Sequence, residues 1–313
     1  MKYNRYTKQA PLVSEIGLGA WQLGVNSGWK SMSEKEAVEM VHKALELGVN
    51  FFDTAPNYGL GTSELRLAKA LKGYDRSKIV INTKFGHTVS GDTNYSSDHI
   101  RVSLEGSLKR LGMDYVDSLI IHNPPFETLD GNKNDHYEIL ERLKDEGKIK
   151  AYGASLDTYG EMKLFMDTTN GEVIEAFFNI LHQDAARAFD LAIEKGVGII
   201  VKIPLDSGWL SGKYGAHSTF ADIRERWTKN DIKTRAELIE RIKEITDKEK
   251  DLAQTAIAFC LAYDAVSTVI PGNSSITQLE SNLKSSEAPM SKALVEKLED
   301  FYQNEVKQLN LPW

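Results

Sequence analysis

The sequence predicts an α/β fold in which eight strands alternate with helices and close into a (β/α)8 TIM barrel. Eight short runs rich in Val, Ile and Phe recur along the 313 residues, separated by charged stretches with apolar residues at helical spacing. This order requires parallel strands joined by crossover helices, and eight repeats favour closure over an open sheet. No Pro-, Gly- or Ser-rich linker divides the chain, so we expect one barrel domain over residues 1–313.

The predicted strands end beside turn-forming residues. In chain order they cover residues 14–20, 48–54, 77–85, 116–123, 148–155, 173–180, 196–204 and 266–272. The clearest predicted helices each end in glycine and cover residues 33–48, 62–73, 96–112 and 135–147. Residues 253–264 also have helical spacing and contain Cys260, the single cysteine, for which we expect a buried apolar position.

Two stretches exceed a minimal barrel. Residues 204–233 form a long connection after the seventh strand, and long connections in compact domains are usually functional. Residues 292–306 predict an additional C-terminal helix, which is followed by residues 309–313 with Trp313 at the end. Either stretch has the length to cover the mouth of the barrel.

Composition and charge argue against several classes of protein. A net charge of −7 and an isoelectric point near 5.6 argue against a nucleic-acid partner. No segment approaches the roughly 20 apolar residues of a membrane helix, and the polar N-terminus lacks the apolar core of a signal peptide. We therefore expect a cytoplasmic protein without a membrane partner. One cysteine permits no intramolecular disulfide, and the scattered histidines predict no metal site.

Four polar residues stand where predicted strands give way to loops. Asp53, Lys84 and His122 follow the apolar parts of the second, third and fourth strands, and Tyr58 lies in the turn after Asp53. Such strand ends are where barrel enzymes hold their catalytic residues. Taken singly, Asp53 could cap a turn, Tyr58 could be a loop aromatic and His122 a core histidine. Lys84 is different, because burying it would require a carboxylate partner or a role.

Together these residues suit carbonyl reduction. A free tyrosine has a pKa of about 10 and is a poor proton donor at neutral pH. A nearby ammonium lowers that pKa, and a carboxylate fixes the lysine, so Lys84 and Asp53 would make Tyr58 a general acid. His122 could hydrogen-bond the same carbonyl oxygen.

Several segments follow, in order, the pattern of the aldo-keto reductases, which the chain resembles over essentially its whole length. The segments are SEIGLGAWQLG, GVNFFDTAPNYG, LRLAKALKG, VINTKFG, SLKRLGMDYVDSLIIHNP, LKDEGKIKAYGAS, PLDSGWLSGKY and VIPGNSS. The resemblance implies a (β/α)8 barrel, usually monomeric, that transfers a hydride between an extended NADP(H) or NAD(H) and a carbonyl or alcohol. It implies a catalytic tetrad of Asp53, Tyr58, Lys84 and His122, with Tyr58 as the acid/base.

The glycines after the first strand do not make a G-x-G-x-x-G motif, so a dinucleotide needs another cradle. Barrels bind phosphate at the loops after strands seven and eight. The resemblance assigns the pyrophosphate to Leu205, Ser207, Gly208, Leu210 and Lys213. It assigns the adenosine half to Gly272, Asn273, Ser274, Gln278 and Asn282. It assigns the rest of the cofactor site to Trp21, Asp53, Ser155, Glu175, Lys202 and Pro204. NADP(H) is favoured and NAD(H) is the alternative, since no Arg or Lys stands at Ser274 or Gln278.

Three positions depart from the family pattern. Leu156 replaces a common Asn, Glu175 replaces a common Gln, and Lys202 replaces an aromatic residue that often stacks on nicotinamide. We expect Glu175 and Lys202, on adjacent strands, to form an ion pair beneath the ring.

The predicted substrate pocket consists of Trp21, Tyr58, Phe85, His122 and Asn123, with Trp29, His87, Trp209 and Trp227 as further candidates. The leading hypothesis is a reductase of small aldehydes, ketones or sugars. A sugar or polyol dehydrogenase using NAD(P)+ and a slow-turnover nucleotide-sensing binding subunit remain as alternatives. A lyase or isomerase that uses Lys84 as a Schiff base is a remote third alternative.

Overall fold

The computed structural model describes residues 1–8, 10–24, 31–246 and 251–312. Within these residues, eight parallel strands follow one another in the sheet in chain order. They are β3 (Leu18–Gly19), β4 (Phe51–Asp53), β5 (Val80–Phe85), β6 (Val116–Ile121), β7 (Ile149–Leu156), β8 (Val173–Phe177), β9 (Gly198–Lys202) and β10 (Val266–Val269). Parallel bridges Ile16–Val269 and Gly19–Gly272 join the first strand region to the last. The predicted barrel is therefore confirmed, and each predicted strand overlaps an observed one.

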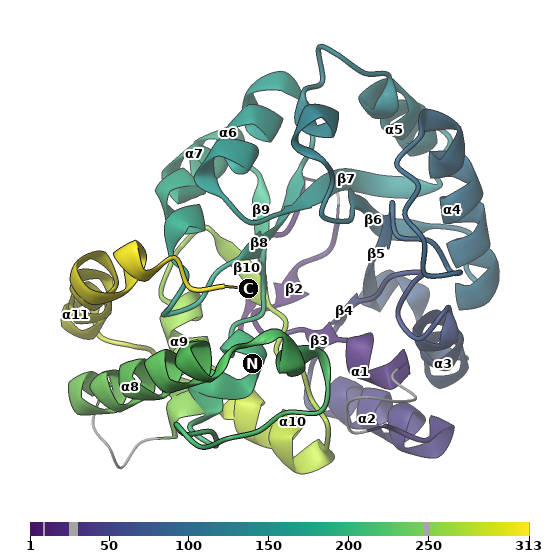
Figure 1. The fold of residues 1–313 in the computed structure, drawn as a ribbon. Helices are drawn as coiled ribbons and strands as arrows, with labels where there is room; N and C mark the ends of the chain where they lie inside the picture. Colours follow the sequence, from purple (N-terminus) through teal and green to yellow (C-terminus); the bar gives the residue numbers. More distant parts are fainter. Residues whose placement is uncertain (9, 25–30, 247–250, 313) are drawn as a thin grey trace.

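Helices surround the ring of strands (Figure 1). They are α1 (Trp21–Gly24), α2 (Glu34–Glu46), α3 (Thr62–Leu71), α4 (Ser97–Leu111), α5 (His136–Asp145), α6 (Tyr159–Thr168), α7 (Phe189–Lys195), α8 (Lys229–Thr246), α9 (Leu252–Leu261), α10 (Ile276–Leu283) and α11 (Lys292–Phe301). Local sequence sets their ends. Ser33 and Glu36 form a capping box at the start of α2, and Gly112 ends α4 with a φ of 64°. Cys260 is fully buried in α9, as predicted.

Strand alternation divides the core into two parts. Along β5, Ile81 and Phe85 pack in the large cluster between sheet and helices, whereas Val80 packs in a small cluster inside the barrel. The interior cluster is closed by Tyr6 and Val13 of the N-terminal segment, where β1 (Tyr3–Asn4) and β2 (Val13–Ser14) form a hairpin. The amino end of the barrel is therefore packed with apolar side chains, which leaves the carboxyl end for polar residues.

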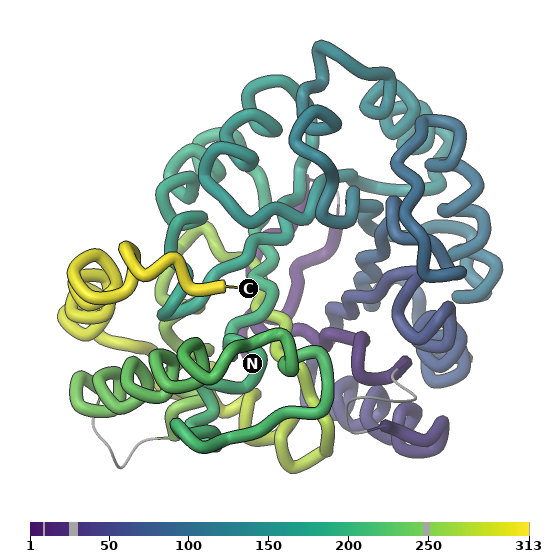
Figure 2. Tube along the Cα trace, in the orientation of Figure 1, coloured from purple at the N-terminus to yellow at the C-terminus, as the bar shows by residue number. Residues whose placement is uncertain are grey.

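The long connection after β9 is partly structured. It contains 3₁₀ turns at Asp206–Ser211 and Ile223–Arg226, and α8 begins inside the predicted connection, at Lys229. Arg235 of α8 is fully buried, 3.3 Å from the Asp206 carboxylate, and donates a hydrogen bond of 2.5 Å to the Pro312 carbonyl. The C-terminal segment, yellow in Figure 2, is thereby tied to the loop at the carboxyl end of the barrel.

The C-terminal helix is shorter than predicted, because α11 ends at Phe301 and a π turn follows at Tyr302–Val306. Trp313 lies outside the described residues. Among the described residues, no helix is long and apolar enough to cross a membrane.

Candidate active site

The structure brings the four predicted tetrad residues together at the carboxyl ends of β4, β5 and β6. Lys84 Nζ lies 2.5 Å from Asp53 Oδ1 and 5.2 Å from the centroid of the Tyr58 ring. The rings of Tyr58 and His122 meet edge to face, with their centroids 5.8 Å apart. The turn after β4 thus returns Tyr58 to the carboxylate and ammonium at the strand ends.

Burial dominates the electrostatics of this cluster. Lys84 is fully buried; burial alone would lower the pKa of its ammonium, but the Asp53 and Glu175 carboxylates hold that pKa well above its usual value. Burial, and then Glu175, raise the pKa of Asp53 to about 7 against the opposing effect of Lys84. Burial and then Lys84 lower the pKa of His122 well below its usual value, so its imidazole is neutral at pH 7.

Tyr58 behaves differently from the sequence expectation. Lys84 lowers the pKa of the phenol as predicted, but burial raises it by more, and the Asp53 and Glu175 carboxylates add to the rise. The net pKa is above the ordinary value, so the expectation of a lowered pKa is wrong. Tyr58 is consequently a phenol throughout the neutral range.

Glu175 and Lys202 do not pair with each other, so the predicted ion pair is wrong. Glu175 Oε2 lies 3.0 Å from Lys84 Nζ, whereas Lys202 Nζ lies 2.8 Å from Asp157 Oδ1. Sheet register explains this, because Glu175 is aligned with Ile200 and Lys202 stands two residues further along β9. The two side chains therefore occupy different levels of the barrel.

Lys202 lies where the nicotinamide-stacking aromatic was expected. Its ammonium also donates to Asn123 Oδ1 at 2.8 Å and to Ser155 Oγ at 2.9 Å. Ser155 Oγ in turn donates to Asn123 Oδ1 at 2.9 Å. Three predicted site residues from β7, β9 and the loop after β6 are thus connected by hydrogen bonds.

A hydrogen-bonded column beneath the tetrad was not predicted. Asn82 donates to Asp53 Oδ1 at 2.6 Å, and Ser118 donates to Asn82 Oδ1 at 2.5 Å. The Tyr6 hydroxyl lies 2.6 Å from Ser118 Oγ. The alternation of side chains along β5 could have predicted it, since Asn82 is polar and stands two residues before Lys84, on the same face of the strand.

The predicted substrate pocket is supported only in part. Phe85 is fully buried in the helix-facing core, because alternation turns it away from Lys84, so its assignment to the pocket is wrong. Trp209 and Trp227 are likewise core residues. His87 stacks on His122 with ring centroids 4.5 Å apart, and Asn123 is exposed with a φ of 46°.

Trp21 is half-buried at the start of α1, after β3. Trp29 lies outside the described residues.

The loop after β9 has the features of a phosphate cradle. Asp206, Ser207 and Gly208 are consecutive and have φ values of 44°, 52° and 93°. Left-handed conformations of non-glycine residues cost about 1–3 kcal/mol each and occur mainly at functional sites. The loop and its position fit the pyrophosphate of a nicotinamide dinucleotide.

Other predicted cofactor residues brace the loops with their side chains. Asn282 donates to Asn273 Oδ1 at 2.8 Å, and Gln278 Oε1 accepts hydrogen bonds from the backbone and hydroxyl of Ser274. The Leu210 side chain is buried in the core. Of the remaining predicted residues, Pro204 is buried and Leu205 is partly buried, whereas Lys213 and Gly272 are exposed.

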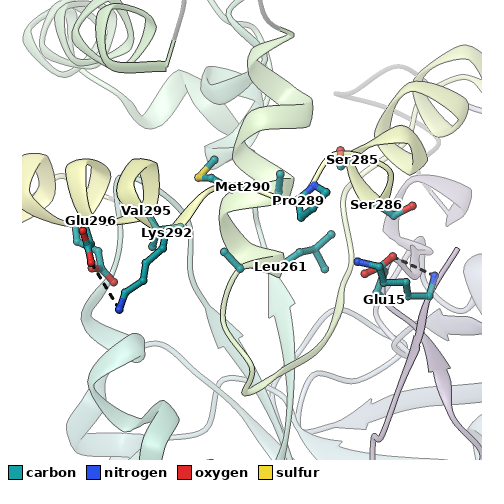
Figure 3. A pocket seen from close by; sticks show the side chains of 13 residues that line it. Glu15, Leu261, Ser285, Ser286, Pro289, Met290, Lys292, Val295 and Glu296 are labelled. Carbon is teal, nitrogen blue, oxygen red and sulfur yellow. Dashed lines mark hydrogen bonds and ion pairs between the residues drawn. The ribbon is translucent and has the colours of Figure 1, made fainter.

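A cavity of about 540 Å³ lies elsewhere, between α9, α11 and the segment that joins α10 to α11 (Figure 3). Leu261, Ser285, Met290 and Val295 contribute to its lining. Leu261 ends α9 and the lining residue Glu15 precedes β3, so this cavity lies at the amino end of the barrel. None of the tetrad residues lines it.

Comparisons with known proteins agree with this geometry. The model of the Aldo/keto reductase family matches residues 15–303. L-galactose dehydrogenase from Arabidopsis thaliana is 30% identical over 87% of this chain and 83% of its own length. A probable voltage-gated potassium channel subunit beta from the same plant is 29% identical over 98% of both chains.

Among solved structures, an aldo-keto reductase from Bacillus halodurans in its holo form superimposes with a TM-score of 0.80, at 28% identity and 96% coverage of both chains. Family match and fold therefore agree. The chain belongs to the aldo/keto reductase family and is an NAD(P)H-dependent oxidoreductase.

Proposed function

We propose that this protein transfers a hydride between NADP(H) and the carbonyl or alcohol carbon of a small aldehyde, ketone or sugar, with Tyr58 as general acid/base. The observation that carries the proposal is the buried Asp53–Lys84 ion pair, 2.5 Å long, whose ammonium lies 5.2 Å from the Tyr58 ring centroid. A lysine held in this way stabilises negative charge as it develops on the phenol oxygen.

The cofactor, when bound, supplies or accepts the hydride. In reduction the Tyr58 hydroxyl gives its proton to the carbonyl oxygen, and Lys84 stabilises the phenolate that remains. Asp53, held by Asn82 and Ser118 from below, keeps Lys84 in position. The neutral His122 can donate a hydrogen bond to the same oxygen and so orient the substrate.

NADP(H) is the favoured cofactor and NAD(H) the alternative. The N-terminal end of α10 offers backbone hydrogen-bond donors to a 2′-phosphate, although neither Ser274 nor Gln278 is an arginine or lysine. This preference rests mainly on the family resemblance. The strained loop at Asp206 and Ser207 serves the pyrophosphate of either cofactor.

Two other functions are supported by relatives. Similarity to L-galactose dehydrogenase favours a sugar or polyol dehydrogenase that uses NAD(P)+. Similarity to potassium channel subunits beta favours a slow-turnover, nucleotide-sensing binding subunit. The sensor would bind cofactor tightly without measurable turnover of any aldehyde.

The test is a fluorescence titration with NADPH and NADH, followed by aldehyde-dependent cofactor oxidation. Tyr58→Phe should bind NADPH as the wild type does but lose turnover by about 10²–10⁴-fold, the usual contribution of general acid–base catalysis. Tyr74→Phe is the matched control, because Tyr74 is 46% exposed and lies between the end of α3 and the amino end of β5. Equal loss in both variants, or full activity of Tyr58→Phe, would overturn the role of Tyr58.

A further inference from the structure

Lys84 lies between two carboxylates that come from distant strands. Asp53 on β4 approaches it at 2.5 Å and Glu175 on β8 at 3.0 Å. In the sheet order, β5, β6 and β7 stand between those two strands, so Glu175 reaches Lys84 across the barrel interior. Glu175 is 2% exposed, and its Oε1 lies 3.4 Å from Ser155 Oγ.

The charges around this lysine do not balance. In the described part of the chain, the titratable or charged groups that face it are Asp53 from β4, Tyr58 from the following turn, His122 from the end of β6 and Glu175 from β8. His122 is neutral at pH 7, and its stacking partner His87 has a pKa lowered by burial and by Lys202. Lys202 is paired with Asp157 one level further along the barrel. One ammonium therefore serves two buried carboxylates.

We propose that Glu175 is a positioning residue that acts through Lys84 to raise the pH at which Tyr58 changes from proton donor to proton acceptor. The second carboxylate engages the same ammonium that would otherwise stabilise the Tyr58 phenolate. The excess negative charge keeps a proton within the cluster, on Tyr58 and, at lower pH, on Asp53. The inference rests on the proposed role of Tyr58 and adds a determinant of its pH range.

The electrostatics agree with this geometry. Glu175 raises both the pKa of Tyr58 and that of Asp53, after burial itself. A unit charge several ångströms away, at an effective dielectric constant of about 20, shifts a pKa by about one unit or more.

The first measurement is the pH profile of reduction of 4-nitrobenzaldehyde by NADPH, for wild type and Glu175→Gln. Glutamine has nearly the same volume and removes only the charge. The alkaline loss of kcat/KM should begin about one pH unit lower in Glu175→Gln. Glu172→Gln is the matched control, because Glu172 is also buried but pairs with Lys144 at the opposite end of β8. The raised pKa of Tyr58 places the alkaline limb above about pH 10, and limbs that superimpose there in wild type and Glu175→Gln would overturn the proposal.

The second measurement needs neither cofactor nor turnover. Infrared difference spectroscopy of the free protein should show a buried carboxyl band that titrates near pH 7, the value expected for Asp53. In Glu175→Gln this titration should move to lower pH, while Glu172→Gln should match the wild type. An unchanged titration in Glu175→Gln would also overturn the proposal. Loss of turnover in the wild type itself would instead contradict the proposed function, and the infrared result would still decide the role of Glu175.

Discussion

The two ends of the barrel each hold a buried carboxylate cluster, and they are built differently. At the amino end, Asp117 of β6 is fully buried and contacts Arg76 at 2.7 Å, Lys150 at 2.9 Å and the Ile81 backbone N–H at 2.9 Å. The side chains of Arg76 and Lys150 are 22% and 30% exposed. At the carboxyl end, the fully buried Lys84 serves two buried carboxylates.

The difference indicates that the amino-end cluster contributes to stability and the carboxyl-end cluster to chemistry. Around Asp117, two cations that reach water compensate one buried carboxylate. Around Lys84, the groups are buried and two carboxylates share one ammonium, so burial and then Glu175 raise the pKa of Asp53 to about 7. Perturbed groups in a cleft at the carboxyl end of a barrel indicate function, whereas the amino end contributes to stability.

The comparison is tested most strongly by removing the lysine from each cluster. Lys84→Met should lower kcat by about 10²–10⁴-fold, because the Tyr58 phenolate loses its cation and Asp53 its partner. Lys150→Met should leave kcat unchanged, since its cluster lies at the other end of the strands. Steady-state kinetics with NADPH and an activated aldehyde measure both. Comparable losses of kcat in the two variants would show that the ends are not functionally separate.

Removal of the carboxylate at the amino end should affect stability alone. Asp117→Ala leaves the buried Ile81 N–H without its acceptor and Arg76 without its carboxylate. We expect a loss of about 2–4 kcal/mol in the free energy of unfolding, reduced from the cost at a fully buried pair because both cations can be hydrated. Urea denaturation measures the loss. Turnover below the midpoint should match the wild type, and a loss of kcat in folded protein would contradict the assignment.

The raised pKa of Asp53, at the carboxyl end, should make the free energy of unfolding depend on pH. An unfolded Asp has a pKa of about 4, and that of folded Asp53 is raised to about 7, so the folded protein binds the extra proton between these values. The stabilisation is complete below pH 4 and is lost as the pH rises through 7. The unfolding free energy of wild type relative to Asp53→Asn should therefore fall by about 1–3 kcal/mol between pH 5 and pH 8. Parallel pH dependences in the two proteins would show that Asp53 titrates normally.

Much of this architecture could be read from the sequence, because strands and helices are set by local patterns. The run from Val80 to Phe85 and the glycine after Leu111 identify a buried strand and a helix end without tertiary information. The predicted element boundaries were wrong where tertiary contacts determine them. α8 begins at Lys229, inside the predicted connection, and α11 gives way to a π turn at Tyr302.

The four strand-end residues were also predictable, because alternation and topology determine their positions. Partners across the barrel were not, since they depend on sheet register and side-chain reach. Glu175 and Lys202 were assigned to one another from the adjacency of their strands, but their register separates them by two residues. Phe85 was misassigned because being next to Lys84 in sequence places it on the opposite face. The net pKa of Tyr58 depended on burial, which the sequence did not specify.

The smallest expected effect distinguishes charge from geometry at the amino end. The Arg76 guanidinium donates to Asp117 and also to the carbonyls of Ile79 and Tyr115, at 2.6 and 3.1 Å. Arg76→Lys keeps the charge, but a single ammonium cannot span the three acceptors. We expect a loss of about 1 kcal/mol in urea denaturation, smaller than for Asp117→Ala because Lys150 still compensates the carboxylate. No loss would mean that charge alone holds this end, whereas a loss as large as that of Asp117→Ala would mean that Lys150 contributes little. With the expected value, the amino end is stabilised by the hydrogen-bond geometry of two cations around one carboxylate, whereas around Lys84 one ammonium serves two carboxylates.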